Sequence, residues 1–140
     1  MTADSPVVFI SHSRIRPGQL DGLRSFLTVG VPALEAAKPR TAAFLAYVDE
    51  ASMMLTIVHL FTNASDFAAH VEGADERSDT AATFIEPVAI EIHGQPDDET
   101  IAAIRAGLPN DVPVRIGTEY IDGFLRPSNR HRDSVWGLRE

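Results

Sequence analysis

The apolar positions of this chain follow two patterns, short apolar or alternating runs and longer stretches with apolar residues every three or four positions. Short runs bounded by turn residues are typical of strands, and the longer spacing is typical of helices packed on one side. The short runs predict four strands, at residues 7–13, 42–48, 53–62 and 87–93. The longer stretches predict three helical regions, at residues 17–37, 63–83 and 97–108.

Turn and capping residues set the expected ends of the helices. Pro17 suits a helix start, because it lacks an N–H that would be unpaired there anyway, and Pro32 predicts a kink or a second segment that reaches Ala37. Asn63 with Asp66 three residues later predicts a capped helix. The polar stretch 73–83 is expected to be a second helical piece or a loop.

The order of these elements predicts an α+β fold. Strand, helix, two strands, helix and strand form the ferredoxin-like βαββαβ pattern, one antiparallel sheet with helices on one face. A further helix and a fifth strand within residues 114–125 would extend it. We therefore expect one domain over residues 1–125, with a core at 6–94, an α-β extension at 95–125 and a basic tail at 126–140.

The first and third strands are apolar on both faces, although helices can cover only one. Residues 7–10 and 53–61 are nearly continuous in apolar side chains, which is the pattern of strands buried on both sides. A second copy of the sheet would cover the other face and predicts a face-to-face homodimer, to which the fifth strand and tail could cross. Alternatively, the third helix and the tail fold over the chain's own sheet.

Charge bears on the partners of the protein. Twelve basic against twenty acidic residues give a net charge of −8, and such a surface repels nucleic acid. The tail holds Arg126, Arg130, Arg132 and Arg139 against two acidic residues. A basic tail on an acidic body favours docking on protein.

The chain has no cysteine, which excludes disulfides, thiolate metal sites and a cysteine nucleophile. Residues 1–6 have neither a basic region nor a long apolar run, so no signal peptide is expected there. No run of about 18 apolar residues suggests a membrane span. A cytoplasmic location without membrane contact is the expectation.

A run of residues around the third strand carries a family resemblance. The strand 53–61 continues into Thr62-Asn63-Ala64-Ser65-Asp66-Phe67-Ala68-Ala69-His70, a strand end with an aromatic residue, a capped turn and an Ala-His pair on a helix. Over residues 6–94 the chain resembles the antibiotic-biosynthesis-monooxygenase-like proteins of the dimeric α+β barrel superfamily. Phe61 stands where that family more often has Trp.

The resemblance implies a small-molecule-binding barrel, and within it a cofactor-independent monooxygenase acting on an aromatic, quinol-like substrate. No bound cofactor is then expected. The haem-degrading relatives use a barrel Trp with an Asn and a His, whereas Trp136 of this chain lies in the tail, which argues against haem. The alternative is a non-catalytic dimeric module for ligand binding or assembly; an isomerase or lyase is not distinguished from the oxygenase.

Three histidines in predicted strands are the candidate catalytic residues: His12, His59 and His93. With the expected strand order 4-1-3-2 they lie near one another, and strand parity decides whether they share a face. His93 is expected opposite the Ile90 and Ile92 face, together with Glu91. A shared patch could act as a general base or hold a metal. Otherwise each is an isolated, hydrogen-bonded strand histidine.

Four further residues are candidates for substrate binding. Tyr47 could hydrogen-bond a quinol through its phenol, Phe61 and His70 follow from the family resemblance, and Arg14 could bind a carboxylate. Arg115, Arg126 and Tyr120 are weaker candidates of the same kinds, since surface arginines and rim tyrosines are common.

Overall fold

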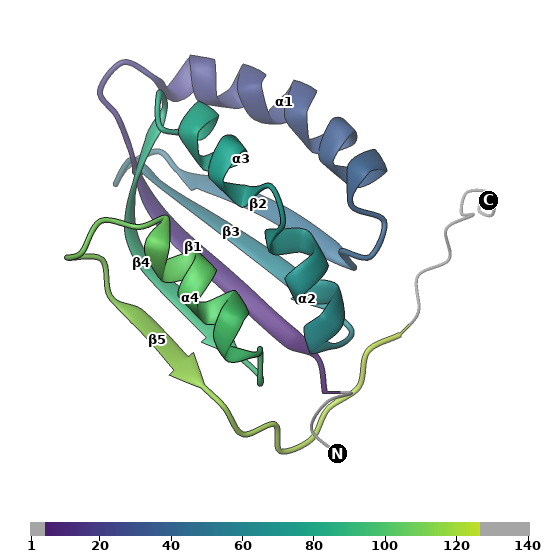
Figure 1. Ribbon diagram of the computed structural model, residues 1–140. Helices are drawn as coiled ribbons and strands as arrows, with labels where there is room; N and C mark the ends of the chain where they lie inside the picture. The colour runs from purple at the N-terminus through teal and green to yellow at the C-terminus, as the bar shows by residue number, and fades with distance from the viewer. Residues whose placement is uncertain (1–4, 127–140) are drawn as a thin grey trace, which may run out of the picture.

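A five-stranded sheet with helices on one face makes up the fold (Figure 1). The computed structural model describes residues 5–126. The strands are β1 (Val7–Ile15), β2 (Ala43–Asp49), β3 (Met54–Phe61), β4 (Ile85–His93) and β5 (Val114–Gly117). The helices are α1 (Leu20–Ala37), α2 (Ala64–Val71), α3 (Ala74–Ala81) and α4 (Asp98–Ala106).

The strand order is β2-β3-β1-β4-β5. β1 is central and antiparallel to both β3 and β4, and β2 forms a hairpin with β3. β5 adds to the edge of β4 in parallel. The four antiparallel strands confirm the ferredoxin-like order predicted from the sequence, and the added helix and strand confirm the extension.

The first helix differs from expectation in its start, and it has no separate segment after Pro32. α1 begins at Leu20, because Pro17 and Gly18 instead form a turn in which Gly18 takes a left-handed φ of 77°. The helix then runs unbroken through Pro32 to Ala37. Pro32 lies on the exposed side, so the helix loses one backbone hydrogen bond there while Leu23, on its packed side, stays buried.

The predicted cap at Asn63 is confirmed, and Asp97 caps a further helix. The side chain of Asn63 accepts a hydrogen bond from the backbone N–H of Asp66 at 2.8 Å, and Asp97 accepts one from Thr100 at 2.8 Å. Each bond satisfies an N–H that the first turn of a helix leaves free. The polar stretch after Gly73 contains the helix α3.

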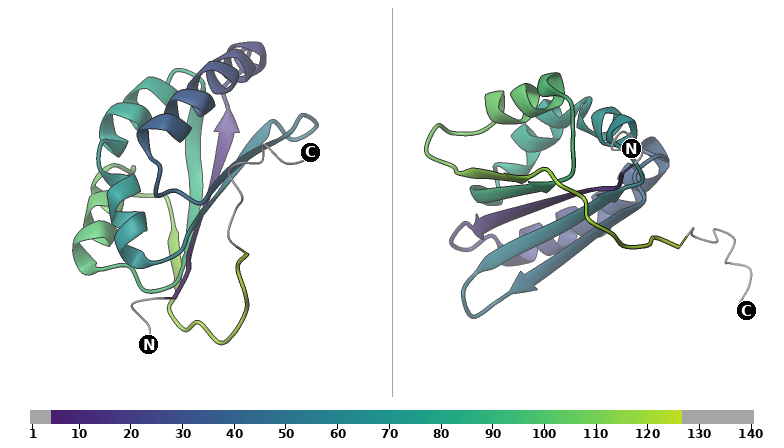
Figure 2. Two further views of the ribbon diagram at one scale, coloured as in Figure 1. Left: turned by 90° about the vertical axis from the view of Figure 1, so that its right-hand side faces the viewer. Right: turned by 90° about the horizontal axis from the view of Figure 1, so that it is seen from below.

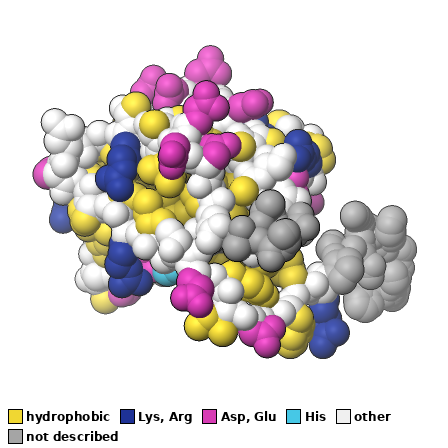
Figure 3. Space-filling model, turned by 60° about the horizontal axis from the view of Figure 1, so that its bottom comes forward, with side chains coloured by type: hydrophobic (Ala, Val, Ile, Leu, Met, Phe, Trp, Pro, Cys, Tyr) yellow, Lys and Arg dark blue, Asp and Glu magenta, His cyan; other side chains and the backbone are white. Residues whose placement is uncertain are grey.

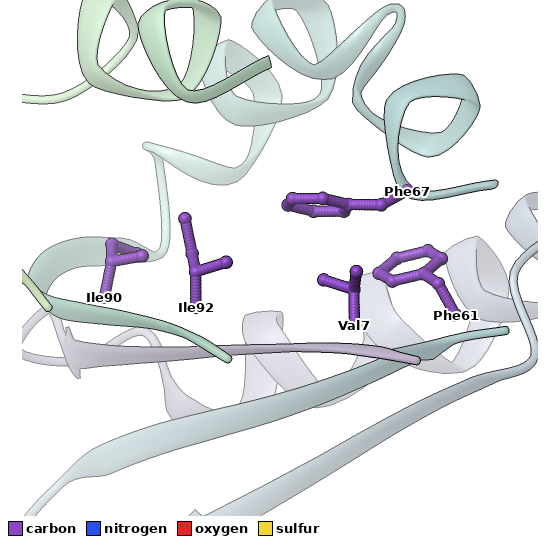
Figure 4. Packing of buried hydrophobic residues seen from close by; sticks show 5 residues of the cluster. All are labelled: Val7, Phe61, Phe67, Ile90 and Ile92. Carbon is purple, nitrogen blue, oxygen red and sulfur yellow. The ribbon is translucent and has the colours of Figure 1, made fainter. Parts of the chain in front are cut away.

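Buried side chains lie between the sheet and the helices. One cluster joins β1, β3, β4 and α2 and consists of Val7, Phe61, Phe67, Ile90 and Ile92 (Figure 4). A second cluster lies under α1 and consists of Ile15, Leu23 and Leu55. Each such side chain contributes about 1.5–3 kcal/mol through burial, so the helix-covered face carries most of the core.

The other face of the sheet, called the open face here, carries no helix among the described residues (Figure 2). Side chains alternate along a strand, and the pairing register places the open-face residues in cross-strand rows. From β1 and β3 they are Val8, Ile10, His12, Arg14, Met54, Thr56, Val58 and Leu60. From the outer strands they include Ala43, Leu45, Tyr47, Ala89, Glu91, His93, Arg115 and Gly117.

Residues 118–126 leave the sheet after β5 and run along the open side (Figure 2). Ile121 and Phe124 in this segment are 86% and 81% exposed. Hydrophobic side chains also reach the surface elsewhere, with charged ones of both signs between them (Figure 3). Among the described residues, no helix is long and apolar enough to cross a membrane.

Candidate functional site

The candidate histidines divide between the two faces of the sheet. His12 lies opposite Thr56 on β3, and His93 lies opposite Val8 on β1, which places both on the open face. His59 pairs with Phe9 and is buried on the helix-covered face. The three imidazoles therefore do not converge, and a base or metal site built from all three is ruled out.

Glu91 joins the two open-face histidines. Its carboxylate accepts hydrogen bonds from Nε2 of His12 at 3.0 Å and from Nε2 of His93 at 3.1 Å. Arg115, from β5, approaches the same carboxylate at 3.4 Å. The prediction that Glu91 and His93 share a face opposite Ile90 and Ile92 is confirmed. We refer to His12, Glu91, His93 and Arg115 as the open-face cluster.

The open-face cluster is a charged site within an apolar face. The hydrogen bond from His12, then that from His93 and the charge of Arg115, lower the pKa of Glu91 below its ordinary value. Its side chain is 28% exposed, and those of His12 and His93 are 31% and 41% exposed. An ionised carboxylate is thus held between two imidazoles that a ligand can reach.

Two predicted substrate-binding residues lie on the same face. Tyr47 pairs with Thr56, whose hydroxyl lies 3.4 Å from Nδ1 of His12. The phenol of Tyr47 is therefore two strands from the imidazole, on a residue that is 58% exposed. Arg14 lies one row further along and forms an ion pair with Glu86 at 3.2 Å, so its charge is already partnered.

The other candidate residues, His59, His70 and Phe61, are buried between the sheet and the helices. His59 and His70 are 6% and 5% exposed, and their rings meet edge to face with centroids 5.1 Å apart. Nδ1 of His59 donates to the carbonyl oxygen of Phe9 at 3.1 Å. Nδ1 of His70 is hydrogen-bonded to the hydroxyl of Thr41 at 2.6 Å. The ring of Phe61 is nearly parallel to that of His59, with centroids 6.3 Å apart, and is tilted against that of His70 at 5.2 Å.

Burial keeps this histidine pair neutral. Desolvation lowers the pKa of His59 to about 4, against the opposing effect of its hydrogen bond to Phe9. Desolvation, followed by the charge on His59, lowers the pKa of His70 to about 3. Aromatic rings fill the space around them, with centroids of Phe9 and Phe44 both 4.8 Å from that of His59. Such packing is typical of a structural role.

A cavity of about 200 Å³ lies at the end of α2 and includes Lys38, Arg40, Thr41 and His70 in its wall. The two basic side chains, Lys38 and Arg40, are already bonded to other groups of the protein. The ammonium of Lys38 donates to two carbonyl oxygens at the end of α2, at 2.8 and 2.9 Å. Arg40 pairs with Asp66 at 2.7 Å. Neither of these two cations is therefore free to bind an anionic ligand.

Sequence reasoning missed the role of Glu91 as the link between the histidines, and it missed Thr56. The alternation of residues 87–93 predicted which face of the sheet Glu91 occupies. It could not predict which residues lie beside Glu91 on the neighbouring strands, because these depend on how the strands are aligned. Arg115 was expected to bind the carboxylate of a substrate, and it instead contacts the carboxylate of Glu91 in its own chain.

The remaining candidates lie near the end of the described residues. Arg126 stacks on the ring of Phe124 at 4.8 Å, and Tyr120 is 42% exposed. Trp136 and the arginines after residue 126 lie outside the described residues.

Among residues 5–126, no three His, Asp or Glu side chains are arranged to hold a metal ion. The open-face cluster offers two imidazoles and one carboxylate that are already hydrogen-bonded to one another. Such an arrangement can transfer a proton, because an imidazole can both accept and donate one.

The topology defines a ferredoxin-like α+β fold with an added helix and strand. Among solved structures, the chain is similar to MupZ from Pseudomonas fluorescens, with a TM-score of 0.64 and 15% identity, over 88% of this chain and 96% of that one. It is also similar to a proposed antibiotic biosynthesis monooxygenase from Bacteroides thetaiotaomicron. That match has a TM-score of 0.51 and 15% identity and covers 64% of this chain and 87% of that one.

A protein of unknown function from Nitrosomonas europaea is similar as well, with a TM-score of 0.53 and 24% identity, over 64% of this chain and 88% of that one. No protein-family model matches the chain, and no curated protein matches it. At these identities the likeness establishes the fold and leaves the activity to be argued from the open-face cluster.

Proposed function

We propose that this protein is a small-molecule-binding α+β barrel that acts as a cofactor-independent monooxygenase on an aromatic, quinol-like substrate. The observation that carries the proposal is the open-face cluster, in which Glu91 holds His12 and His93 on an apolar sheet face. A planar apolar ligand would lie against Ile10 and Val58 with an acidic O–H or C–H near an imidazole. The fold neighbours described as monooxygenases agree with this chemistry.

The chemistry requires a base and molecular oxygen. An imidazole removes a proton from the substrate, and the resulting carbanion forms a C–O bond with O₂, which is reduced to a peroxide. The imidazolium returns the proton to give a hydroperoxide. Loss of water then leaves a ketone, so one oxygen atom enters the product and the other leaves as water. The protein supplies proton transfer and a site poor in water.

Enclosure of the cluster by a second copy of the chain is part of the proposal. In one chain the open face leaves Leu45 47% exposed and Tyr47 58% exposed, and Ile121 and Phe124 project from the segment beside it. Two open faces packed together would bury these side chains and exclude water from the imidazoles. Native mass spectrometry tests this, since the protein should carry the mass of two chains, whereas a monomer would contradict it.

Oxygen uptake with anthrone tests the activity. Anthrone is a tricyclic ketone whose enol is a phenol, and its oxidation by O₂ to anthraquinone and water follows the steps above. We expect uptake that saturates with anthrone, falls at least 10-fold in His93→Gln, and is unchanged in Arg105→Gln, which alters the exposed side of α4. Uptake that is absent, or equal in all three proteins, would refute the oxygenase.

The alternative is a non-catalytic dimeric module for ligand binding or assembly. Close packing around His59 and His70 favours it, because that site has aromatic rings where a substrate would need space. Saturable quenching of anthrone fluorescence without oxygen uptake would support ligand binding. A dimer that neither binds anthrone nor consumes oxygen would support assembly alone.

A further inference from the structure

We infer that Glu91 is a positioning residue that holds His12 and His93 as Nε2–H tautomers and so makes Nδ1 of His93 the proton-accepting atom of the site. This inference rests on the proposed function for its catalytic meaning. The positions of the hydrogen atoms can be tested without any substrate.

Glu91 is placed between the two imidazoles by the register of the sheet. It pairs with Ile10 on β1 and with Arg115 on β5. His12 lies one row to one side of Glu91 on the open face, and His93 one row to the other. Its two carboxylate oxygens are therefore divided, with Oε2 facing His12 and Oε1 facing His93.

The carboxylate determines which ring nitrogen carries hydrogen. Because an ionised carboxylate can only accept hydrogen bonds, the Nε2 atom of each imidazole must donate. A neutral imidazole has one N–H, so in both rings Nδ1 is the nitrogen with a free lone pair. The lowered pKa of Glu91 supports its ionised state at neutral pH.

The two Nδ1 atoms differ in their surroundings. Nδ1 of His12 faces the hydroxyl of Thr56 at 3.4 Å. Nδ1 of His93 has no hydrogen-bond partner among residues 5–126. Its neighbour across the sheet edge is Gly117, where a Cβ would lie only 3.1 Å from that nitrogen. Glycine at 117 thus keeps the space beside the free nitrogen open to a substrate that donates a proton.

Other charged groups on this face also act on the site. Arg115 shares Oε1 of Glu91 with His93 and is 74% exposed. The ion pair of Arg14 with Glu86 lies one row beyond His12. From β2, Tyr47 and Asp49 are the ionisable residues on this face, and the carboxylate of Asp49 accepts hydrogen bonds from Ala51 and Ser52 in the adjacent turn. Arg115 shares Oε1 without reaching Nδ1 of either ring, so it stabilises the ionised Glu91 and leaves the tautomers unchanged.

Long-range ¹H–¹⁵N correlation spectra of the ¹⁵N-histidine-labelled protein at pH 7.5 provide the test. For His93 of the wild-type protein we expect a protonated Nε2 and an unprotonated Nδ1. A protonated Nδ1 would overturn the inference whatever the activity. Glu91→Gln can donate from its amide, so we expect it to mix the two tautomers, whereas Glu99→Gln, on the exposed side of α4, should leave the spectra unchanged.

Oxygen uptake with anthrone then separates the positioning role of Glu91 from the proposed oxygenase activity. We expect Glu91→Gln to lower kcat at least 10-fold with KM changed less than 3-fold, and Glu99→Gln to change neither. Tautomers as expected in a protein without oxygen uptake would support the positioning role and refute the oxygenase. An unchanged His93 spectrum in Glu91→Gln would overturn the positioning role even if the enzyme is active.

Discussion

Acidification should destabilise this protein through the buried pair His59 and His70. Their pKa values of about 4 and about 3 in the folded chain lie below the ordinary value of 6.5. A group with a lowered folded pKa stabilises the fold above its unfolded pKa, and this contribution is lost as pH falls. The loss therefore begins near pH 6.5 and continues to about pH 4 for His59 and about pH 3 for His70.

The size of the effect follows from these values. Each pH unit below the unfolded pKa costs about 1.4 kcal/mol for each histidine that stays neutral in the folded state. At pH 5 the cost is therefore about 2 kcal/mol for each imidazole and about 4 kcal/mol for the pair. This is a large part of the 5–15 kcal/mol that typically stabilises a domain.

Urea unfolding followed by far-ultraviolet circular dichroism at pH 7 and pH 5 measures this difference, in a range where most carboxylates stay ionised. His59→Leu and His70→Leu should each reduce the pH-dependent loss by about 2 kcal/mol, whatever their stability at pH 7. His93→Gln, which removes a histidine of the open face, should keep most of the loss. If the three variants lose the same stability as the wild type, burial of neutral imidazoles is not the cause.

Three further variants test the core, a turn and the proposed dimer. Phe67→Ala should cost about 3–5 kcal/mol in urea unfolding through the cavity it leaves, and a cost below 1 kcal/mol would contradict the packing described. Gly94→Ala should destabilise the protein by about 1–3 kcal/mol, because φ at this position is 131° and the new Cβ would lie 2.9 Å from the carbonyl oxygen of Pro6. An unchanged thermal midpoint would show that this turn relaxes. Ile121→Ser with Phe124→Ser should convert a dimer to a monomer in native mass spectra with an unchanged circular dichroism spectrum, and a dimer that persists would exclude this segment from the interface.

The order of the elements could be read from the sequence because local signals set it. The alternation at residues 87–93 gave the face of His93 correctly, since Ile90 and Ile92 contrast with Glu91. The first and third strands are apolar on both sides, so their periodicity carries no sign of which face His12 or His59 occupies. That sign comes from the register of β1 against β3, in which Phe9 meets His59, and register depends on contacts distant in sequence.

The first helix shows how packing overrides local signals. Pro17 and Gly18 would suit the start of a helix, yet the strand β1 extends to Ile15 and both residues lie in the turn that follows it. Pro32 is a helix breaker by itself, yet α1 continues through it to Ala37 with Pro32 on the exposed side. Neither outcome is visible without the sheet.

Strand alternation gives this sheet two independent mutational surfaces. Odd-numbered residues of β3, such as Leu55 and Phe61, carry the core, whereas even-numbered ones, such as Thr56 and Val58, face the open side. Substitutions on the open side should accordingly cost the fold of the single chain little. A saturation library at Leu45, Thr56 and Val58 would therefore report on the proposed dimer and ligand contacts separately from the core on the other face.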